Sequence, residues 1–530
     1  MINEKYCMNQ TSFSRHFFNS AGKATGVFLK LYMLVWIVSS AGCSSFYDVD
    51  LYSVVKDAEF NKNREDLNAS AIGMYEPLTQ EVHKFLLWGD ARADMVTTGQ
   101  DVPDPYINEF VSNSISVENP YTNYAGIYKS IARCNRQMEK VYEVAKLDDN
   151  IVERDAGAFY AEALLLRSFC YFILVKNFET FPIIRSDVAE KITYVNESGD
   201  TVTRKTQTLT SGEIRDSYYY AGSQEEVLRM IYNDVLTVLG ILPLDYQWNG
   251  SSLSSEERYG RVSQVMAATF AAELALWLGD YQAASAYANS PVRNTNHTLG
   301  ASGTWVNQFT NSYAPLHSMF LLGYNYTNSF EVNRLQEFTS PVAGDGGRYF
   351  LKPFFSATDS IFSDDSSDIR SQFSYKTIAG KNVIWKYIGT DNVSSIRPAY
   401  QSDASWPFYR NADAFIFKAL ADLMLNDYST AFNFLNQIRV ARGLPELIPA
   451  NTDYTNKEYM LDLLFKEKAR EFAYEGKRWY DLMLWSRLSG VNKLAERVAG
   501  KYEVSQQSQV LAKLQDEANW YIPIDPKLWE

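Results

Sequence analysis

A short internal repeat limits what this chain can fold into more than any other feature. The segment "ALWLGDYQAASAYAN" recurs as "DLMLNDYSTAFNFLN" 147 residues later, with apolar positions, the Asp-Tyr pair and a small Ala in register. In each copy a helical pattern ends at Gly279 or Asn426, residue types that tolerate the left-handed cap conformation. Asp280 or Asp427 follows in the position of an N-cap. The repeat therefore predicts two helix–turn–helix units that resemble tetratricopeptide repeats.

Helical periodicity also marks the chain before the first copy of the repeat. Apolar residues recur at spacings of three and four in 59–78, 121–145 and 153–178. The last of these segments is apolar nearly all round, which indicates a buried helix. Cys134 and Cys170 fall in these segments, so we expect small buried side chains rather than a disulfide or reactive thiols. The pattern predicts a mostly all-α fold.

The chain between the two copies has a different composition. Residues 291–407 are rich in Ser, Thr, Asn, Gly and aromatics, and they show little helical periodicity. So much irregular chain inside a helical protein is uncommon unless it is functional. We expect one domain over 43–530, in which 43–290 and 408–530 form a helical scaffold and 291–407 is an irregular, aromatic-rich, ligand-binding insertion.

Composition removes several classes of function. The net charge is −13 without a basic stretch, so a nucleic-acid partner is not expected. Four His in 530 residues, none paired, argue against a metal site, and no phosphate-binding or dinucleotide motif indicates a cofactor. A hydrolase that uses two carboxylates remains open. Aromatics reach 15%, which hints at a surface that stacks on a flat ligand.

The N-terminus resembles a secretion signal. "LYMLVWIV" supplies eight apolar residues, too few to span a bilayer but enough for the apolar core of a signal peptide. The small residues directly before Cys43 resemble the lipobox of bacterial lipoproteins, although Ser40 stands where Leu is usual. We expect 1–42 to be a signal peptide and Cys43 to carry lipid. Ordinary cleavage near Ala41, or an uncleaved anchor, is the alternative.

The stretch "LFKEKAREFAYEGKRWYDLMLWSR" has the charge density of an active site. Its Glu residues step by four and line one helical stripe flanked by Lys and Arg, an arrangement that favours ion pairs. A break at Gly476 lets Arg478 reach back to Glu475 or Asp481. We therefore predict a structural ion-pair network rather than catalytic carboxylates, formed by Glu471, Glu475, Arg478 and Asp481.

Several motifs, taken in order, resemble the SusD/RagB family. They include "CSSFYDVD", "GDARADM", "GRVSQVMAATFAAELALWLGDYQAA" and the closing "WYIPIDP". The most specific is Glu-Gly-x-Arg-Trp-x-Asp-Leu, which here runs from Glu475 to Leu482. The resemblance implies a non-catalytic lipoprotein of the outer membrane, exposed at the cell surface. It also implies capture of nutrients, usually glycans, beside a SusC-like TonB-dependent transporter.

The ligand site has to be sought outside those scaffold motifs. Sugar rings present apolar C–H faces, so a binding surface needs exposed aromatic side chains with amides and carboxylates nearby. In the family, ligands bind on loops that elaborate the scaffold. The candidates that we name in irregular chain are Trp88, Tyr106, Trp305, Tyr313, Tyr324 and Tyr326. The opposing interpretation is that each of them is part of a loop core.

Three functions remain after these arguments. The favoured one is a glycan-binding lipoprotein that acts with a transporter. The second keeps the scaffold but binds peptides, which an acidic surface would suit if they were cationic. The third, a carboxylate hydrolase, conflicts with the motif content.

Overall fold

The computed structural model describes residues 60–524, except for 102, 186–190, 196–200, 206, 209–216, 221, 245–259, 294–297, 311–317, 330, 363–366 and 391–394. Residues 61–530 form one compact unit. The predicted signal peptide, Cys43 and Tyr313 lie outside the described residues.

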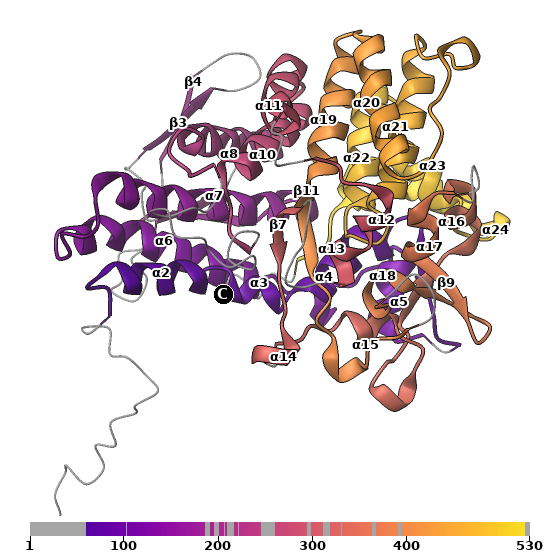
Figure 1. The fold of residues 1–530 in the computed structure, drawn as a ribbon, viewed down its shortest axis with the longest axis horizontal. Coiled ribbons are helices and arrows are strands. Elements are labelled where there is room, and N and C mark those ends of the chain that lie inside the picture. Colours follow the sequence, from indigo (N-terminus) through magenta and orange to yellow (C-terminus); the bar gives the residue numbers. More distant parts are fainter. Residues whose placement is uncertain are drawn as a thin grey trace, which may run out of the picture. The chain divides into compact units, whose positions relative to one another are not determined.

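Helices dominate the unit (Figure 1), so the predicted mostly helical fold is confirmed. The longer ones are α2 (Arg64–Gly73), α6 (Ala125–Ala145), α7 (Glu153–Asn177), α8 (Gln224–Val238), α10 (Gln264–Trp277), α11 (Tyr281–Arg293), α19 (Asn411–Met424), α20 (Tyr428–Ala441), α21 (Lys457–Glu471), α22 (Arg478–Ser489), α23 (Lys493–Ala499) and α24 (Val504–Leu514).

The two copies of the repeat are the helix pairs α10–α11 and α19–α20, as predicted. Gly279 and Asn426 adopt positive φ angles of 77° and 66° between the helices of each pair. The carboxylates of Asp280 and Asp427 each accept a hydrogen bond from the backbone N–H three residues later, at 3.0 and 3.2 Å. Helix α11 also packs on α19 (Figure 1), so the two pairs join into one layer although they are far apart in the sequence.

Shorter pieces elaborate this scaffold. Before α6 they are α3 (Glu76–Thr79), α4 (Val82–Leu86), the π-helix η2 (Leu87–Ala91), α5 (Pro105–Val111) and η3 (Pro120–Thr122). Within the insertion they are α12 (Ser302–Trp305), α13 (Asn307–Thr310), α14 (Tyr326–Ser329), α15 (Leu335–Thr339), η4 (Ala343–Asp345), α16 (Phe355–Phe362), α17 (Ile369–Ser374), α18 (Trp385–Ile388) and η5 (Ala399–Gln401). The C-terminal part adds η6 (Pro449–Asn451) and η7 (Glu517–Trp520).

The strands form small antiparallel groups. The pairs are β1 (Val96–Thr98) with β8 (Leu351–Pro353), β9 (Tyr375–Ile378) with β10 (Lys381–Ile384), β3 (Lys191–Val195) with β4 (Thr201–Lys205), and β7 (Ser318–Leu322) with β11 (Trp406–Arg410). A three-stranded group has the order β2 (Pro182–Arg185), β6 (Ser217–Tyr220), β5 (Gln207–Thr208). Because Leu322 pairs with Trp406, the excursion 323–405 begins and ends at the same end of one ribbon.

Two hydrophobic clusters hold the unit together. The larger one fills the space between the helices and includes α7, which is long and apolar enough to cross a membrane but is 94% buried over its most apolar window, as in a core helix. Cys134 and Cys170 are buried in it and unpaired, and burial raises the pKa of the Cys134 thiol well above its ordinary value. The second cluster belongs to the insertion and consists of Trp305, Phe309, Tyr349, Phe373, Val383, Trp385 and Ile388.

Candidate functional site

The charged stretch after residue 464 forms the end of α21 and the start of α22. Glu471 is fully buried, and its carboxylate contacts three guanidinium groups. Arg410, Arg442 and Arg370 approach its oxygens to 2.8, 2.9 and 3.1 Å. Burial raises the pKa of Glu471, but these cations outweigh that effect and hold the pKa well below its ordinary value. A carboxylate so enclosed cannot reach a substrate.

The other residues of the predicted network are also buried in ion pairs, but one partner differs from the prediction. Lys386 contacts Glu475 at 2.7 Å, and Lys468 contacts Asp481 at 2.7 Å. Arg478 pairs with Asp94 at 2.8 Å instead of with Glu475 or Asp481. Spacing along one helix could not reveal this, because the two residues are 384 positions apart.

The turn between these helices explains the break in the helical pattern. Gly476 has φ +69° and lies against Gly89 of η2. A Cβ at Gly89 would stand 1.9 Å from the Gly476 carbonyl oxygen, so the two backbones can approach only without a side chain there. Asp90 holds the turn by accepting hydrogen bonds from the N–H groups of Gly476 at 2.6 Å and Arg478 at 3.3 Å.

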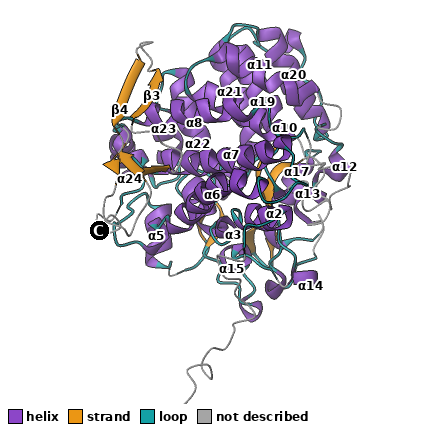
Figure 2. Cartoon of the chain, turned by 90° about the vertical axis from the view of Figure 1, so that its left-hand side faces the viewer, coloured by secondary structure: helices purple, strands orange, loops and turns teal. Residues whose placement is uncertain are grey.

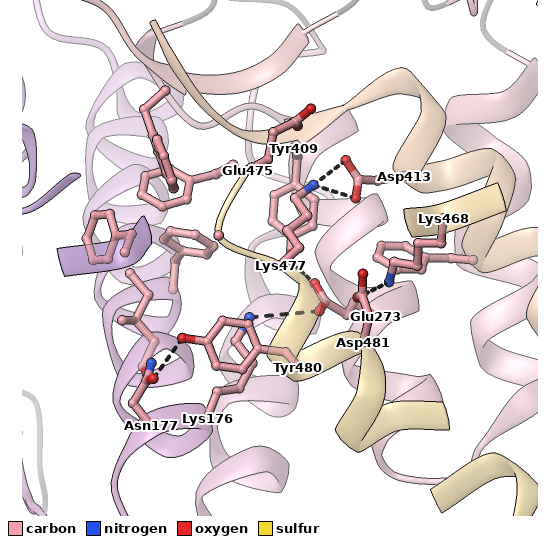
Figure 3. Close-up of a pocket in the computed structure, with 17 residues that line it drawn as sticks. Lys176, Asn177, Glu273, Tyr409, Asp413, Lys468, Glu475, Lys477, Tyr480 and Asp481 are labelled. Atoms are coloured by element: carbon pink, nitrogen blue, oxygen red, sulfur yellow. Dashed lines mark hydrogen bonds and ion pairs between the residues drawn. The ribbon is translucent and has the colours of Figure 1, made fainter. Parts of the chain in front are cut away.

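A partly open cavity of about 60 Å³ lies between these helices and α7 (Figure 3). It mixes aromatic walls with charged groups that contact one another. Lys477 contacts Asp413 at 2.7 Å, and the Tyr480 hydroxyl donates to Asn177 at 2.7 Å. Burial lowers the pKa of Lys176, on the same wall, to about 8. The space accommodates a few water molecules.

Three of the aromatic residues predicted to bind ligand do not line a surface. Trp88 and Trp305 are fully buried, and Tyr324 is nearly so. The Trp88 indole donates to the Tyr121 carbonyl at 2.9 Å, the Trp305 indole to Glu471 at 3.2 Å, and the Tyr324 hydroxyl to the Thr79 carbonyl at 2.6 Å. Their prediction as stacking platforms was wrong, because Trp88 and Tyr324 pack into the main hydrophobic cluster and Trp305 packs into the cluster of the insertion. Trp305 and Tyr324 even lie in different hydrophobic clusters.

The remaining candidates that the structure describes are more accessible. Tyr106 is 40% exposed on α5, and Tyr326 is partly exposed at the start of α14. Tyr326 meets a residue that sequence reasoning missed. The ring of Tyr400, on η5, lies edge-on to it with centroids 5.5 Å apart, and Tyr400 is 61% exposed. We call Tyr326 and Tyr400 the tyrosine pair.

A hydrogen-bonded frame positions the tyrosine pair. The backbone N–H of Asn333 donates to the Ser402 carbonyl at 2.7 Å, and the Ser402 hydroxyl donates to the Asn333 side chain at 2.9 Å. The Asn333 amide also donates to the Ala404 carbonyl at 2.8 Å. These bonds fasten the segment after α14 to the segment after η5. The two rings therefore lie beside a buried, hydrogen-bonded base at the end of the β7–β11 ribbon.

Polar and aromatic groups continue from this frame. Arg334, the next residue after Asn333, pairs with Glu337 at 2.7 Å and lies over the Phe338 ring at 5.4 Å. Its guanidinium also interacts with the hydroxyl of the partly exposed Tyr121. Burial lowers the pKa of the neighbouring His83 to about 3, so this imidazole is neutral. Planar donors and rings of this kind suit hydroxyl-rich ligands.

The described residues contain no group of three His, Cys, Asp or Glu side chains that could hold a metal ion. Figures 1 and 2 both place α14 and α15, which flank the frame, at the same end of the unit.

Comparisons with known proteins agree along nearly the whole chain. Residues 323–527 match the model of the SusD family, and residues 46–273 match a model described as starch-binding and associating with the outer membrane. A SusD-like protein P38 from Formosa agariphila is 22% identical over 491 residues, which is 83% of this chain and 88% of that protein.

Solved structures repeat the fold. A SusD superfamily protein from Bacteroides vulgatus superposes with a TM-score of 0.68 at 19% identity, covering 88% of this chain and 97% of that one. Surface glycan-binding protein A from Bacteroides uniformis gives 0.67 at 20% identity, with the same coverage of 88% and 97%. The buried motif around Glu475, the repeat pairs and these two matched regions agree, and the chain belongs to the SusD/RagB family.

Proposed function

We propose that this protein is a non-catalytic lipoprotein of the outer membrane that captures glycans and passes them to a partner TonB-dependent transporter. The observation that carries the proposal is the tyrosine pair. Tyr400 exposes most of its ring beside Tyr326, on a frame that holds both in place. Stacking of sugar C–H faces on such rings needs exposed aromatic surface and little rearrangement. The names of the matched family model and of the Bacteroides uniformis protein support the same ligand class.

The buried carboxylates argue against the hydrolase alternative. Glycoside hydrolysis needs two carboxyl groups that flank a substrate. The carboxylates of Glu471, Glu475 and Asp481 are held by buried cations and are not free to flank a substrate. The charged stretch is therefore part of the scaffold in this proposal.

The test is binding of soluble polysaccharides. The mature chain is run by affinity electrophoresis through gels that contain starch, xylan, a mixed-linkage β-glucan or pectin, and the affinity for a retained polymer is measured by calorimetry. The double variant Y326A/Y400A should bind at least tenfold more weakly, since each ring contributes roughly 1–2 kcal/mol when it is covered. Tyr459 is 41% exposed on α21 and supplies the matched control Y459A, which should bind like the wild type.

Two outcomes would replace the proposal. Binding of a peptide digest without binding of any polysaccharide would favour the peptide alternative. Release of reducing sugar from a retained polysaccharide would revive the hydrolase.

The membrane and transporter parts of the proposal are tested separately. With lipid on Cys43 the wild-type protein should fractionate with outer membranes, and Cys43→Ala should move it to the soluble fraction. Affinity purification of the tagged protein from mild detergent should bring down a large outer-membrane barrel protein. Unchanged fractionation of Cys43→Ala would remove the lipid anchor from the proposal.

A further inference from the structure

The turn between α6 and α7 carries an exposed apolar tip that the glycan site does not use. Leu147 is 69% exposed, Val152 53%, Tyr142 48% and Ile241 44%. Tyr142 stands against Tyr160 of α7 with ring centroids 5.9 Å apart. We call Tyr142, Leu147, Val152 and Ile241 the apolar tip.

These side chains belong to one place in the fold. Leu147 and Val152 flank a single turn, in which the Ile151 N–H donates to the Asp148 carbonyl. Ile241, just past α8, reaches the first turns of α7, because a Cβ on Gly157 would lie 3.4 Å from it. Scattered single apolar residues are ordinary on a protein surface, but several exposed apolar residues gathered around one turn indicate an interaction site.

The outer face of α6 leads up to this tip with basic side chains. Lys129, Arg133, Arg136 and Lys140 are spaced by four, three and four residues and share one helical stripe. Glu76 pairs with Arg133 at 2.9 Å and Glu143 with Lys140 at 2.5 Å, and Glu139 lies at the edge of the stripe. Figure 2 shows α6 and α2 on the face that is turned toward the viewer.

The chain enters the compact unit at this same tip. The Arg64 N–H donates to Asp148 at 2.9 Å, and the Arg64 guanidinium contacts the Asn150 carbonyl at 3.4 Å and Asp155 at 2.5 Å. The start of α2 is thereby clamped to the α6–α7 turn. Only residues 44–60 separate the unit from Cys43, and a chain of that length spans at most roughly 60 Å. A lipid on Cys43 keeps this end of the unit close to the bilayer.

We infer that the apolar tip rests on the lipid bilayer, with the basic stripe of α6 over the phosphate layer. This inference depends on the lipid anchor of the proposed function. Apolar side chains beside Lys and Arg match the boundary between acyl chains and headgroups. A tether makes a weak contact of this kind effective, because it raises the local concentration of the surface. The contact would fix which face of the protein looks away from the membrane.

The experiment is vesicle cosedimentation of the mature chain that carries Cys43→Ser, so that no acyl chain contributes. Vesicles contain phosphatidylcholine and phosphatidylglycerol at a ratio of 7:3. The unacylated protein should bind weakly, and the tip variant L147S/V152S/I241S should bind roughly tenfold more weakly. The control L425S/V440S/I448S changes side chains that are 45%, 50% and 58% exposed on other elements, and it should bind like the parent.

Three results of the vesicle experiment would overturn the inference. They are absence of cosedimentation by the parent, equal binding of parent and tip variant, and an equal loss in the control. Loss of transporter copurification in a tip variant that still binds vesicles would also overturn it, since the tip would then contact a protein.

Polysaccharide binding of the same variants keeps the two proposals apart. The tip variant should retain the glycan affinity of the parent, because its substitutions lie outside the frame that holds the tyrosine pair. If the tip variant loses vesicle binding but keeps glycan binding, the result supports the membrane contact of the apolar tip and shows that it is separate from glycan binding. Absence of glycan binding in every variant, with the vesicle difference intact, would sink the proposed function and leave the tip standing.

Discussion

The cluster around Glu471 and the tyrosine pair differ in charge and in exposure to solvent. The cluster joins the buried carboxylate of Glu471, on α21, to buried guanidinium groups that come from α17, β11 and the residue after α20. The tyrosine pair consists of two uncharged rings in short elements of the insertion, and it exposes most of one ring to solvent. The difference teaches that the dense charge around Glu471 holds the scaffold together. The exposed rings of the tyrosine pair are the groups that are accessible to a ligand.

The substitution Glu471→Gln tests the role of the cluster most directly and should have the largest effect on stability. The substitution keeps the shape of the side chain but leaves three buried guanidinium groups without their shared anion, so the free energy of unfolding should fall by about 3–5 kcal/mol. Urea denaturation followed by circular dichroism measures it. The control Glu458→Gln, on the exposed first turn of the same helix, should change stability by less than about 0.5 kcal/mol. A loss below about 1 kcal/mol for Glu471→Gln would show that the cluster is not what holds these elements together.

Trp305→Ala tests whether the insertion has its own core. Removing a fully buried indole that also donates to Glu471 should cost about 3–5 kcal/mol. The folded fraction should keep the polysaccharide affinity of the wild type, measured by calorimetry under native conditions. If Trp305→Ala keeps the stability of the wild type but loses polysaccharide affinity, Trp305 belongs to the binding surface after all.

Asp90→Asn tests the turn between η2 and α22 through pH. Burial raises the pKa of Asp90 to about 7, so between pH 4 and 7 the folded state binds a proton that the unfolded chain has released. This contribution to stability is lost as pH rises through 7, with a slope of at most about 1.4 kcal/mol per pH unit. Asp90→Asn should remove that slope from unfolding curves measured at pH 5, 6, 7 and 8.

Asp427 supplies the control for this titration. Its hydrogen bonds to Thr430 lower the pKa of its carboxyl, so its proton is lost well below pH 5 in both states. Asp427→Asn should therefore shift stability by the same amount at each of the four pH values. Equal slopes for the wild type and Asp90→Asn would mean that Asp90 is ionised throughout.

The smallest change in the free energy of unfolding is expected for Tyr400→Ala. The ring is mostly exposed, so unfolding should change by less than about 0.5 kcal/mol while polysaccharide binding weakens. Tyr324 lies in the same excursion but is buried and bonded to Thr79, and Tyr324→Ala should cost roughly 3 kcal/mol or more. Thermal unfolding of the two variants side by side compares one residue type in two environments.

Local rules predicted the scaffold well. Gly279 and Asn426 take the left-handed conformation, and Asp280 and Asp427 cap the following helices, because caps depend on a few adjacent residues. The burial of α7 could also be predicted locally, because a helix without a polar face must be enclosed.

The candidate site could be predicted only in part. Loop composition cannot tell whether a Trp points outward or into a core that forms far along the chain, and Trp305 packs with residues as distant as Phe373 and Trp385. Tyr326, which we predicted to bind ligand, is partly exposed, but its neighbour Tyr400 was missed. A signal was present, since Tyr400 lies between Pro398 and the polar run Gln401–Asp403, where an aromatic has few apolar partners nearby.

The pairing of Asp94 with Arg478 has a consequence for how the chain folds. A chain stopped before Gly476 would lack both the guanidinium that Asp94 needs and the amides that Asp90 needs. Contacts between positions this far apart form late and slowly during folding. Until the last tenth of the chain is present, the first helices expose incomplete charge pairs to proteases. The segment that contains Gly476 and Arg478 therefore acts as a check on chain length. Only chains that extend past Arg478 can complete these buried contacts and become protected.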